Sequence, residues 1–418
     1  MIKLYTLLLH LALPLVVLRL LWRSLRAPGY RRRLGERFGF FEGAPPPGGI
    51  WIHAVSVGEV QAIEPLVRWL QKHHPQRALT LTTTTPTGAE RARRLFGDDL
   101  FLLYFPYDLP WVLQRFLLRI QPALLILVET EIWPNLLRAC RRHQVATLLA
   151  NGRLSERSAR GYGRLGDFAR RVFGDIQAVA AQSAADAERF AALGVPRERI
   201  EVTGSIKFDM RIPASVQEQA QVMRRLFGEG RPIWIAASTH EGEEERVLAA
   251  HRQVLARHPD ALLLLVPRHP ERFDRVAALV QRKGFTLGRR SRRQEGEGKA
   301  EVFLVDTMGE LPLFLGVADV AFIGGSLVPV GGHNMLEAAA QGVPVLFGPH
   351  LFNFSAIARL LIEEEAAVQI DDAHGLARWV SAWLGDASER SRYGENGRRV
   401  VAANRGALER LARIVERL

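Results

Sequence analysis

Two glycine pairs and a glutamate in residues 318–349 predict a nucleotide site. The glycines, at 324–325 and 331–332, follow a short apolar run, and a helical pattern starts at Asn334. Glycines let backbone amides approach a ligand closely, and the start of a helix offers unpaired N–H groups to a phosphate. Glu337, one turn into the helix, could accept hydrogen bonds from ribose hydroxyls. An ordinary strand-to-helix turn would explain one glycine pair, but two pairs beside a helical glutamate favour a nucleotide.

A second candidate, Glu59, ends the sequence Ser56-Val57-Gly58-Glu59 after an apolar run. A carboxylate at this strand-to-helix turn could take a proton from an acceptor hydroxyl. The competing interpretation is a capping box, because Ser-x-x-Glu also satisfies the backbone donors of a helix N-terminus. Such a terminus favours the ionised carboxylate and so reduces its proton affinity, and nearby negative charge would have to offset that effect.

Two acids and a lysine could add to this chemistry. Glu129 is the first polar residue after the apolar run 124–128, whereas Glu131 would point to the opposite face if the strand continued. One of these acids could instead cap a helix. Lys207 lies at the end of the first predicted domain and could stabilise a phosphate or a developing oxyanion, although a hinge lysine in solvent is equally compatible with its position.

Three further turns, 237–243, 266–270 and 306–311, also follow apolar runs. The first carries hydroxyls, the second offers the guanidinium and imidazole of Arg268 and His269 to a phosphate, and the third contains a glycine that would let the backbone approach a base or ribose. Each signal is weak alone. In a parallel α/β sheet, however, these turns are neighbours at the carboxyl ends of the strands, so together they favour a ligand site.

Several functional classes lack their signals in the sequence. The chain has no G-x-x-x-x-G-K-[ST] loop, no paired-histidine motif and no Asp-x-Asp. We therefore expect neither a metal nor a cofactor, although the Glu-x-Glu at 129–131 leaves the metal prediction short of certain. Aromatic and basic residues do not interleave outside the N-terminal segment, so we expect no nucleic-acid partner.

Alternating apolar runs and helical patterns predict an α/β fold. The strands read as continuous apolar runs, which indicates parallel sheets with both faces covered by helices. We expect an N-terminal anchor and basic segment at 1–40, a Rossmann-like acceptor domain at 41–209 and a Rossmann-like nucleotide domain at 210–418, with the two domains facing each other across a ligand cleft. We expect a solvated loop at 289–299.

Charge and hydropathy point to a membrane. The net charge is +12, and residues 1–40 carry +7 of it. Residues 4–22 are nearly all apolar and long enough to cross a bilayer, but His10 and Pro14 make an in-plane helix a competitor. The positive charge that follows predicts a cytoplasmic protein body, with residues 23–37 against anionic headgroups unless they form a solvated linker. The single cysteine fits a reducing compartment.

The chain resembles the 3-deoxy-D-manno-octulosonic acid (Kdo) transferases of lipopolysaccharide assembly nearly end to end. The stretches that carry the resemblance are HAVSVGEV, TTTTPTG, PYDLPW, ETEIWPN, NGRLSERS, GSIKFD, STHEGEEE, LVPRHPERF, DTMGEL and GGSLVPVGGHNMLEAAAQGVPVLFGPHLFNF. It implies a glycosyltransferase-B fold, a CMP-Kdo donor, a tetraacylated lipid A precursor (lipid IVA) as acceptor, inversion at the anomeric carbon, no metal, and attachment to the cytoplasmic side of the inner membrane.

The resemblance also assigns roles to residues that match the family motifs. Its proton acceptor falls on Glu59, and its transition-state residues fall on Glu129 and Lys207. Its CMP contacts fall on Arg268, His269, Met308, Gly309, Glu310, Asn334, Met335, Leu336 and Glu337.

Two other functions remain as alternatives. One is a sugar-nucleotide epimerase or hydrolase of the same fold that acts on a UDP-sugar, and the membrane anchor and its basic collar argue against it. The other is a membrane protein that senses nucleotides without catalysis.

Overall fold

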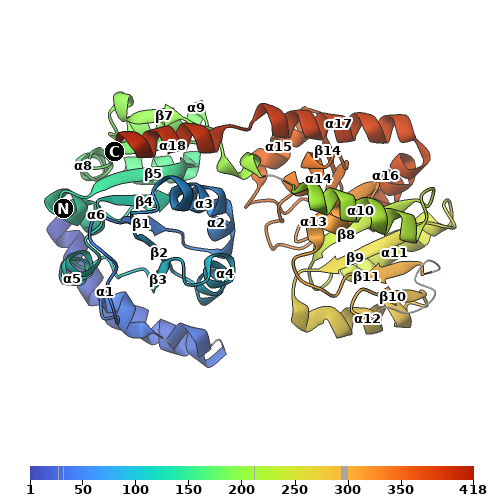
Figure 1. Ribbon diagram of the computed structural model, residues 1–418, viewed down its shortest axis with the longest axis horizontal. Coiled ribbons are helices and arrows are strands. Elements are labelled where there is room, and N and C mark those ends of the chain that lie inside the picture. Colours follow the sequence, from blue (N-terminus) through green and yellow to red (C-terminus); the bar gives the residue numbers. More distant parts are fainter. Residues whose placement is uncertain (27, 32, 211, 293–299) are drawn as a thin grey trace. The chain divides into compact units, whose positions relative to one another are not determined.

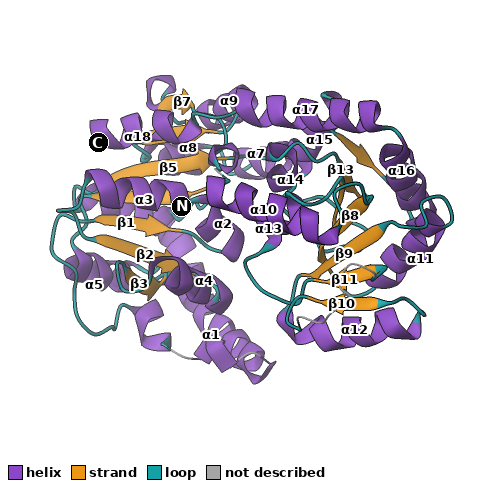
Figure 2. Ribbon diagram, turned by 45° about the vertical axis from the view of Figure 1, so that its right-hand side comes forward, coloured by secondary structure: helices purple, strands orange, loops and turns teal. Residues whose placement is uncertain are grey.

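The computed structural model forms two compact units, each built on one parallel sheet (Figure 1). It describes residues 1–26, 28–31, 33–210, 212–292 and 300–418. The first unit comprises Met1–Asp209 and Arg405–Leu418, and the second comprises Met210–Asn404. Each sheet has seven strands, and helices pack on its faces (Figure 2). The predicted α/β class is therefore confirmed.

The first sheet has the order β3-β2-β1-β4-β5-β6-β7. Its strands are β1 (Ile50–His53), β2 (Leu79–Thr83), β3 (Phe101–Tyr104), β4 (Leu124–Val128), β5 (Ala146–Gly152), β6 (Ala178–Ala181) and β7 (Ile200–Val202). Successive residues of β1 enter opposite cores, because side chains alternate between the faces of a strand. Ile50 and Ile52 pack with one layer of helices, whereas Trp51 packs with the other.

Helices cover both faces of this sheet. The chain forms α1 (Ile2–Arg26), η1 (Pro28–Arg31), η2 (Leu34–Phe38), α2 (Val57–Ala62), α3 (Glu64–His73), α4 (Pro86–Phe96), α5 (Pro110–Ile120), α6 (Pro134–Arg142), α7 (Glu156–Gly163), α8 (Asp167–Gly174), α9 (Ala184–Ala192), η3 (Arg197–Arg199) and η4 (Ile206–Asp209). Helices α2 to α4 bury apolar residues on one face, and α5, α6, α8 and α9 bury theirs on the other.

The second sheet has the order β10-β11-β9-β8-β12-β13-β14. Its strands are β8 (Ile233–Thr239), β9 (Leu262–Pro267), β10 (Leu287–Arg289), β11 (Val302–Leu304), β12 (Val320–Ile323), β13 (Val345–Phe347) and β14 (Ala367–Gln369). Its helices are α10 (Ala214–Phe227), α11 (Glu244–Leu255), η5 (Pro270–Arg272), α12 (Phe273–Arg282), α13 (Leu311–Leu315), α14 (Leu336–Ala340), α15 (Ser355–Glu363), α16 (Ala373–Gly385) and α17 (Ala387–Ala403). Helices α11, α12 and α16 share one buried core with the sheet.

The end of the chain differs from the predicted domain 210–418. Residues 405–418 belong to the first unit, where α18 (Ala407–Arg417) buries Leu411 in the core that β1 and α3 also line. Asp209 caps this helix, since its carboxylate accepts hydrogen bonds from the Gly406 and Leu408 amides at 2.6 and 2.7 Å. The apolar stripe of α18 is readable in the sequence, but nothing local shows which unit it covers.

The strands that sequence analysis missed are β3, β7, β10 and β14. All four lie at the edges of their sheets. An edge strand has a neighbour on one side only and is often short, so it lacks the long apolar run that marks a central strand. The central strands, by contrast, carry the runs from which the sheets were predicted.

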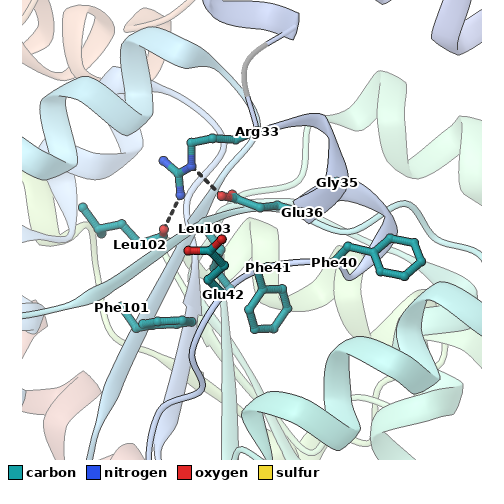
Figure 3. Close-up of a pocket in the computed structure, with 9 residues that line it drawn as sticks. All are labelled: Arg33, Gly35, Glu36, Phe40, Phe41, Glu42, Phe101, Leu102 and Leu103. Carbon is teal, nitrogen blue, oxygen red and sulfur yellow. Dashed lines mark hydrogen bonds and ion pairs between the residues drawn. The ribbon is translucent and has the colours of Figure 1, made fainter.

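The N-terminal basic segment is more internal than predicted. The Arg37 side chain is 3% exposed and donates to the Thr84 carbonyl, and the Arg33 guanidinium pairs with Glu36 and the Leu102 carbonyl (Figure 3). These two arginines therefore hold the segment against the first unit, where Arg37 is buried and Arg33 remains exposed. Arg33 borders a cavity of about 370 Å³, whose other lining residues are Gly35, Glu36, Phe40, Phe41, Glu42, Phe101, Leu102 and Leu103.

The placement of α18 generates a stability prediction. Leu411→Ala leaves a cavity in the core of the first unit and should destabilise it by about 2–5 kcal/mol. Hydrogen exchange monitored by mass spectrometry should show faster exchange in β1 and unchanged exchange in β8. Leu418→Ala, at a residue that is 40% exposed, is the control and should change neither. Faster exchange in β8 with β1 unaffected would contradict the assignment of α18 to the first unit.

Candidate functional site

Glu59 lies in the first turn of α2, directly after β1. Its carboxylate accepts hydrogen bonds from the Val55 amide at 2.8 Å and from the Ser56 hydroxyl at 3.0 Å, while the Glu59 amide donates to Ser56 Oγ at 3.5 Å. The capping box that competed with the catalytic interpretation is therefore formed. The carboxylate can still accept a further hydrogen bond or a proton, because each oxygen carries two lone pairs and each accepts only one of these bonds.

The environment of Glu59 supplies the proton affinity that a base needs. Burial raises the pKa of its carboxyl to about 7, and the charges of Glu129 and Glu131 act in the same direction against the Val55 and Ser56 hydrogen bonds. The folded protein thus holds this proton more tightly than the unfolded chain does. The contribution of Glu59 to the free energy of unfolding consequently falls as the pH rises from about 4.5 to about 7.

Glu129 and Lys207 form an ion pair beside this carboxylate. Lys207 Nζ lies 2.9 Å from Glu129 Oε1, and both side chains are largely buried. Glu129 has a φ of 60°, in the left-handed region, so β4 ends at Val128 and the alternation of faces stops there. Lys207 lies in η4, where Asn151 Oδ1 accepts the neighbouring Ile206 amide at 3.2 Å. Lys207 is accordingly a positioned side chain in a folded turn and not a hinge lysine in solvent.

Glu131 and His53 join the same cluster. The sequence placed Glu131 on the face opposite Glu129 and gave His53 no role. Glu131 accepts a hydrogen bond from Trp133 Nε1 at 2.9 Å, and burial together with Glu129 raises its pKa. His53 Nε2 lies 4.0 Å from Glu131 Oε2, but burial lowers the pKa of His53 to about 3, so the imidazole is neutral. His53 could have been found from the sequence, because it ends an apolar run just before the turn that carries the candidate base Glu59.

In the second unit, the first glycine pair does not bind an external anion through the amides that we expected. The Glu243 carboxylate accepts the amides of Gly325, Ser326 and Leu327 at 2.7, 3.1 and 2.9 Å, and also the His240 amide at 2.9 Å. An internal anion thus occupies the glycine loop. The loop still requires its glycine, because Gly325 has a φ of +67° and a Cβ there would lie 3.1 Å from the His333 ring.

The second glycine pair and the helix that follows are also more restricted than predicted. The Gly331 and Gly332 amides both donate to the Gly325 carbonyl, at 3.1 and 2.8 Å. Helix α14 has five residues, and the Met335 and Leu336 side chains are fully buried. Only their backbone could contact a ligand. Asn334 Nδ2 donates to Glu337 Oε1 at 3.2 Å, so these two polar side chains lie together beside the loop.

A histidine cluster borders the glycine loop. His240 Nε2 and His333 Nε2 lie 2.7 Å apart with nearly parallel rings, and the His269 ring centroid is 5.3 Å from that of His240. Burial, with the charges of His269, Arg272 and Arg268, lowers the pKa of His240 to about 4. The turn after β8 and the turn after β9 therefore do converge, and the positive potential around them suits an anion.

The third turn places Met308 and Gly309 at the surface. Met308 is 49% exposed, and Gly309 has a φ of +87° with open space where a Cβ would lie. Glu310 accepts hydrogen bonds from Arg290, and this pairing lowers its pKa. Arg290 belongs to the stretch 289–299 that we expected to be a solvated loop. Arg289 in the same stretch pairs with Asp306 at 2.7 Å, and residues 293–299 lie outside the described residues.

Each unit therefore collects predicted residues at the carboxyl ends of its strands. The first unit brings together Glu59, Glu129 and Lys207, and the second brings Arg268 and His269 to the edge of the glycine loop. Among the residues that the structure describes, no three His, Cys, Asp or Glu side chains are grouped in a way that could hold a metal ion.

Sequence comparison identifies the relatives of this chain. A family model described as 3-deoxy-D-manno-octulosonic-acid transferase (kdotransferase) matches residues 32–210. The 3-deoxy-D-manno-octulosonic acid transferase of Haemophilus influenzae is 46% identical over 410 residues, which cover 97% of this chain and 96% of the relative. The transferase of the same name from Bordetella pertussis is 39% identical over 425 residues, with the same two coverages.

Solved structures confirm the type of fold. A UDP-GlcNAc 2-epimerase from Neisseria meningitidis superposes with a TM-score of 0.59 at 10% identity, covering 88% of this chain and all of the other. A glycosyltransferase from Rickettsia africae gives a TM-score of 0.56 at 13% identity, covering 88% and 97%. At such identities the likeness shows a glycosyltransferase-B type of fold and no activity. Given the near full-length match to the curated relatives, the chain belongs to the family of Kdo transferases, which are glycosyltransferases.

Proposed function

We propose that this protein transfers Kdo from CMP-Kdo to the tetraacylated lipid A precursor, lipid IVA, with inversion at the anomeric carbon. The carboxylate of Glu59 carries the proposal. It lies at the carboxyl end of β1, beside a partly buried ion pair, and its pKa of about 7 suits a base that works near neutral pH. An epimerase acting on a UDP-sugar has no comparable support, because the solved structures of low identity show only the type of fold.

The reaction needs one proton acceptor and one clamp for negative charge. A hydroxyl oxygen of the acceptor attacks the anomeric carbon of Kdo while the bond from that carbon to the CMP phosphate oxygen breaks. Glu59 takes the hydroxyl proton, and the bonding electrons leave with CMP. A developing oxocarbenium centre at the sugar is favoured by the negative charge of Glu129, which Lys207 holds in position at 2.9 Å.

The second unit supplies the proposed nucleotide contacts. Arg268 and His269 offer cationic and imidazole donors to the phosphate, and Gly309 leaves room for the backbone of residues 308–310 to approach the base or ribose. Residues 334–337 contribute the Asn334 and Glu337 side chains and the backbone of the two buried residues between them. CMP departs with its phosphate already ionised, so we expect these cations to suffice without a metal.

The acceptor and the N-terminal helix place the reaction at a membrane. A lipid A precursor lies in a bilayer, and we propose that the protein acts on the cytoplasmic side of the inner membrane, held by α1 and by anionic lipids. Confinement to the bilayer surface turns the search for the acceptor from three dimensions into two.

Removing the base should abolish transfer and spare nucleotide binding. We expect Glu59→Gln to lower the rate of Kdo transfer by about 10²- to 10⁴-fold, the usual contribution of general-base catalysis. Mass spectrometry of lipid IVA incubated with CMP-Kdo reports the transfer and the number of Kdo units together. Calorimetric titration with CMP should give the wild-type affinity.

The matched control is Glu64→Gln, which changes a half-exposed carboxylate at the start of the next helix, α3. This variant should transfer Kdo at the wild-type rate. Transfer by Glu59→Gln at the wild-type rate would remove Glu59 from the mechanism, and loss of CMP binding would show that the substitution disturbs the fold.

The environment of Glu59 also predicts the pH profile. Because the ionised carboxylate is the active form, kcat/KM should rise with pH and reach half of its maximum near pH 7. Glu131→Gln removes a neighbouring negative charge that raises this pKa, so the midpoint should move to lower pH. Glu64→Gln should leave the midpoint in place. A midpoint that stays near 7 in Glu131→Gln would show that the charge of Glu131 does not reach Glu59.

A further inference from the structure

Helix α1 packs lengthwise against the first unit. Residues that are only partly exposed, together with the buried Ser24, recur along it at every third or fourth position, which is the spacing of one helical face. They are Ile2, Tyr5, Thr6, Leu9, Ala12, Leu13, Val17, Leu20 and Ser24. Figure 1 shows the helix starting beside α6. A helix that merely tethers a protein to a membrane would contact the body at one end and not along a face.

Specific polar contacts fix the N-terminal end of α1. Tyr5 Oη donates to Asp108 Oδ2 at 2.8 Å, and Thr6 Oγ1 donates to Asn135 Oδ1 at 2.9 Å. The Tyr5 ring also packs against Phe168, with centroids 6.1 Å apart. Asp108 is buried and caps α6 through the Asn135 and Leu136 amides, so its carboxylate joins the two helices.

The other end of α1 returns to the same unit. Ser24 is buried, and in the turn that follows a Cβ at Gly29 would lie 3.0 Å from the Pro86 Cβ at the start of α4. Tyr5 and Ser24 are separated by about 28 Å at the helical rise, close to the thickness of the hydrocarbon layer. If α1 crossed a bilayer, Tyr5 would lie on the far side from Asp108. The observed contacts are therefore incompatible with a spanning helix.

The opposite face of α1 is a continuous apolar surface. Its exposed residues, which we call the leucine face, are Leu4, Leu7, Leu8, Leu11, Leu15, Leu18, Trp22 and Leu25. On a helical projection Lys3 and His10 flank it on one side and Arg19 and Arg23 on the other, and all four are exposed. Apolar surface between basic rims is the pattern of a helix that lies in a membrane interface.

The charges select anionic lipid over a second copy of the chain as the occupant of the leucine face. Helix α1 contains no acidic residue. Two copies packed through their leucine faces would bring basic rims together with no acid on either helix to pair them. Anionic headgroups, in contrast, would meet both rims while acyl chains cover the leucines.

We propose that α1 is an in-plane anchor: the leucine face enters the acyl region of one leaflet, and the Tyr5 and Thr6 contacts hold the helix parallel to the surface of the first unit. The chain then lies entirely on one side of the membrane. This inference deepens the proposed membrane location, but it does not depend on the Kdo transfer chemistry.

The side of the membrane on which residue 3 lies distinguishes an in-plane helix from a spanning helix. We expect Lys3→Cys and Glu156→Cys, the latter an exposed residue of α7, to react with a membrane-impermeant maleimide from the same side of sealed vesicles. The wild-type protein gives the background, because Cys140 is buried. Labelling of Lys3→Cys from the opposite side only, or no labelling in intact vesicles, would overturn the proposal.

A binding experiment tests the leucine face itself. The double substitution Leu11→Ser and Leu15→Ser should weaken binding to phosphatidylglycerol vesicles by at least about 10-fold. Leu226→Ser, which changes an equally exposed leucine in α10, should bind like the wild type. Unchanged binding by the double variant overturns the proposal, as does a stable wild-type dimer that the double substitution dissociates. Kdo transfer to a detergent-solubilised acceptor should persist in the double variant, which separates failure of this inference from failure of the proposed function.

Discussion

Burial of like charges at the ends of two neighbouring strands is the constraint on which the site depends. Glu59, Glu129 and Glu131 are drawn together where β1 and β4 end, and partial removal from water raises the pKa of Glu59 to about 7. Lys207 offsets some of this charge at 2.9 Å from Glu129. The arrangement costs stability, because desolvated carboxylates resist ionisation. The same cost leaves a carboxylate that binds a proton near neutral pH, and the capping bonds to Val55 and Ser56 hold it in one orientation.

In the second unit, the groups that need partners are backbone N–H donors and not carboxylates. Its glycine loop concentrates backbone donors, and the buried carboxylate of Glu243 satisfies three of them. A loop closed in this way is shaped before any nucleotide arrives, so binding would not have to order it. Arg268, His269 and the His240–His333 pair lie at its rim. The pKa of both paired histidines is lowered, so the positive charge suited to a phosphate comes from Arg268.

In the proposed attachment, helix α1 links this chemistry to the membrane. Asp108, which holds Tyr5, also caps α6, and α6 starts directly after the turn that carries Glu131 and Trp133. The anchor and the acidic cluster therefore share one structural support. The proposed in-plane anchor would fix the height of the first unit above the lipid surface, which a flexible tether would not do.

Much of this protein was readable from local patterns. Long apolar runs predicted the central strands, and polar residues directly after those runs predicted Glu59, Glu129 and Arg268 at one edge of each sheet, because parallel strands all end on the same side. The apolar N-terminal helix and the basic segment that follows it were equally visible. These features depend on residues within one or two turns of each other, and periodicity is a local property.

Contacts between distant residues were decided only by the tertiary structure. The sequence did not show that Glu243 occupies amides 82 to 84 positions away, that Lys207 meets Glu129, or that α18 returns to the first unit. The four edge strands and the docked face of α1 were not predicted for the same reason. A buried donor or apolar face takes whichever partner the folded chain brings within reach, and no short stretch of sequence specifies that choice.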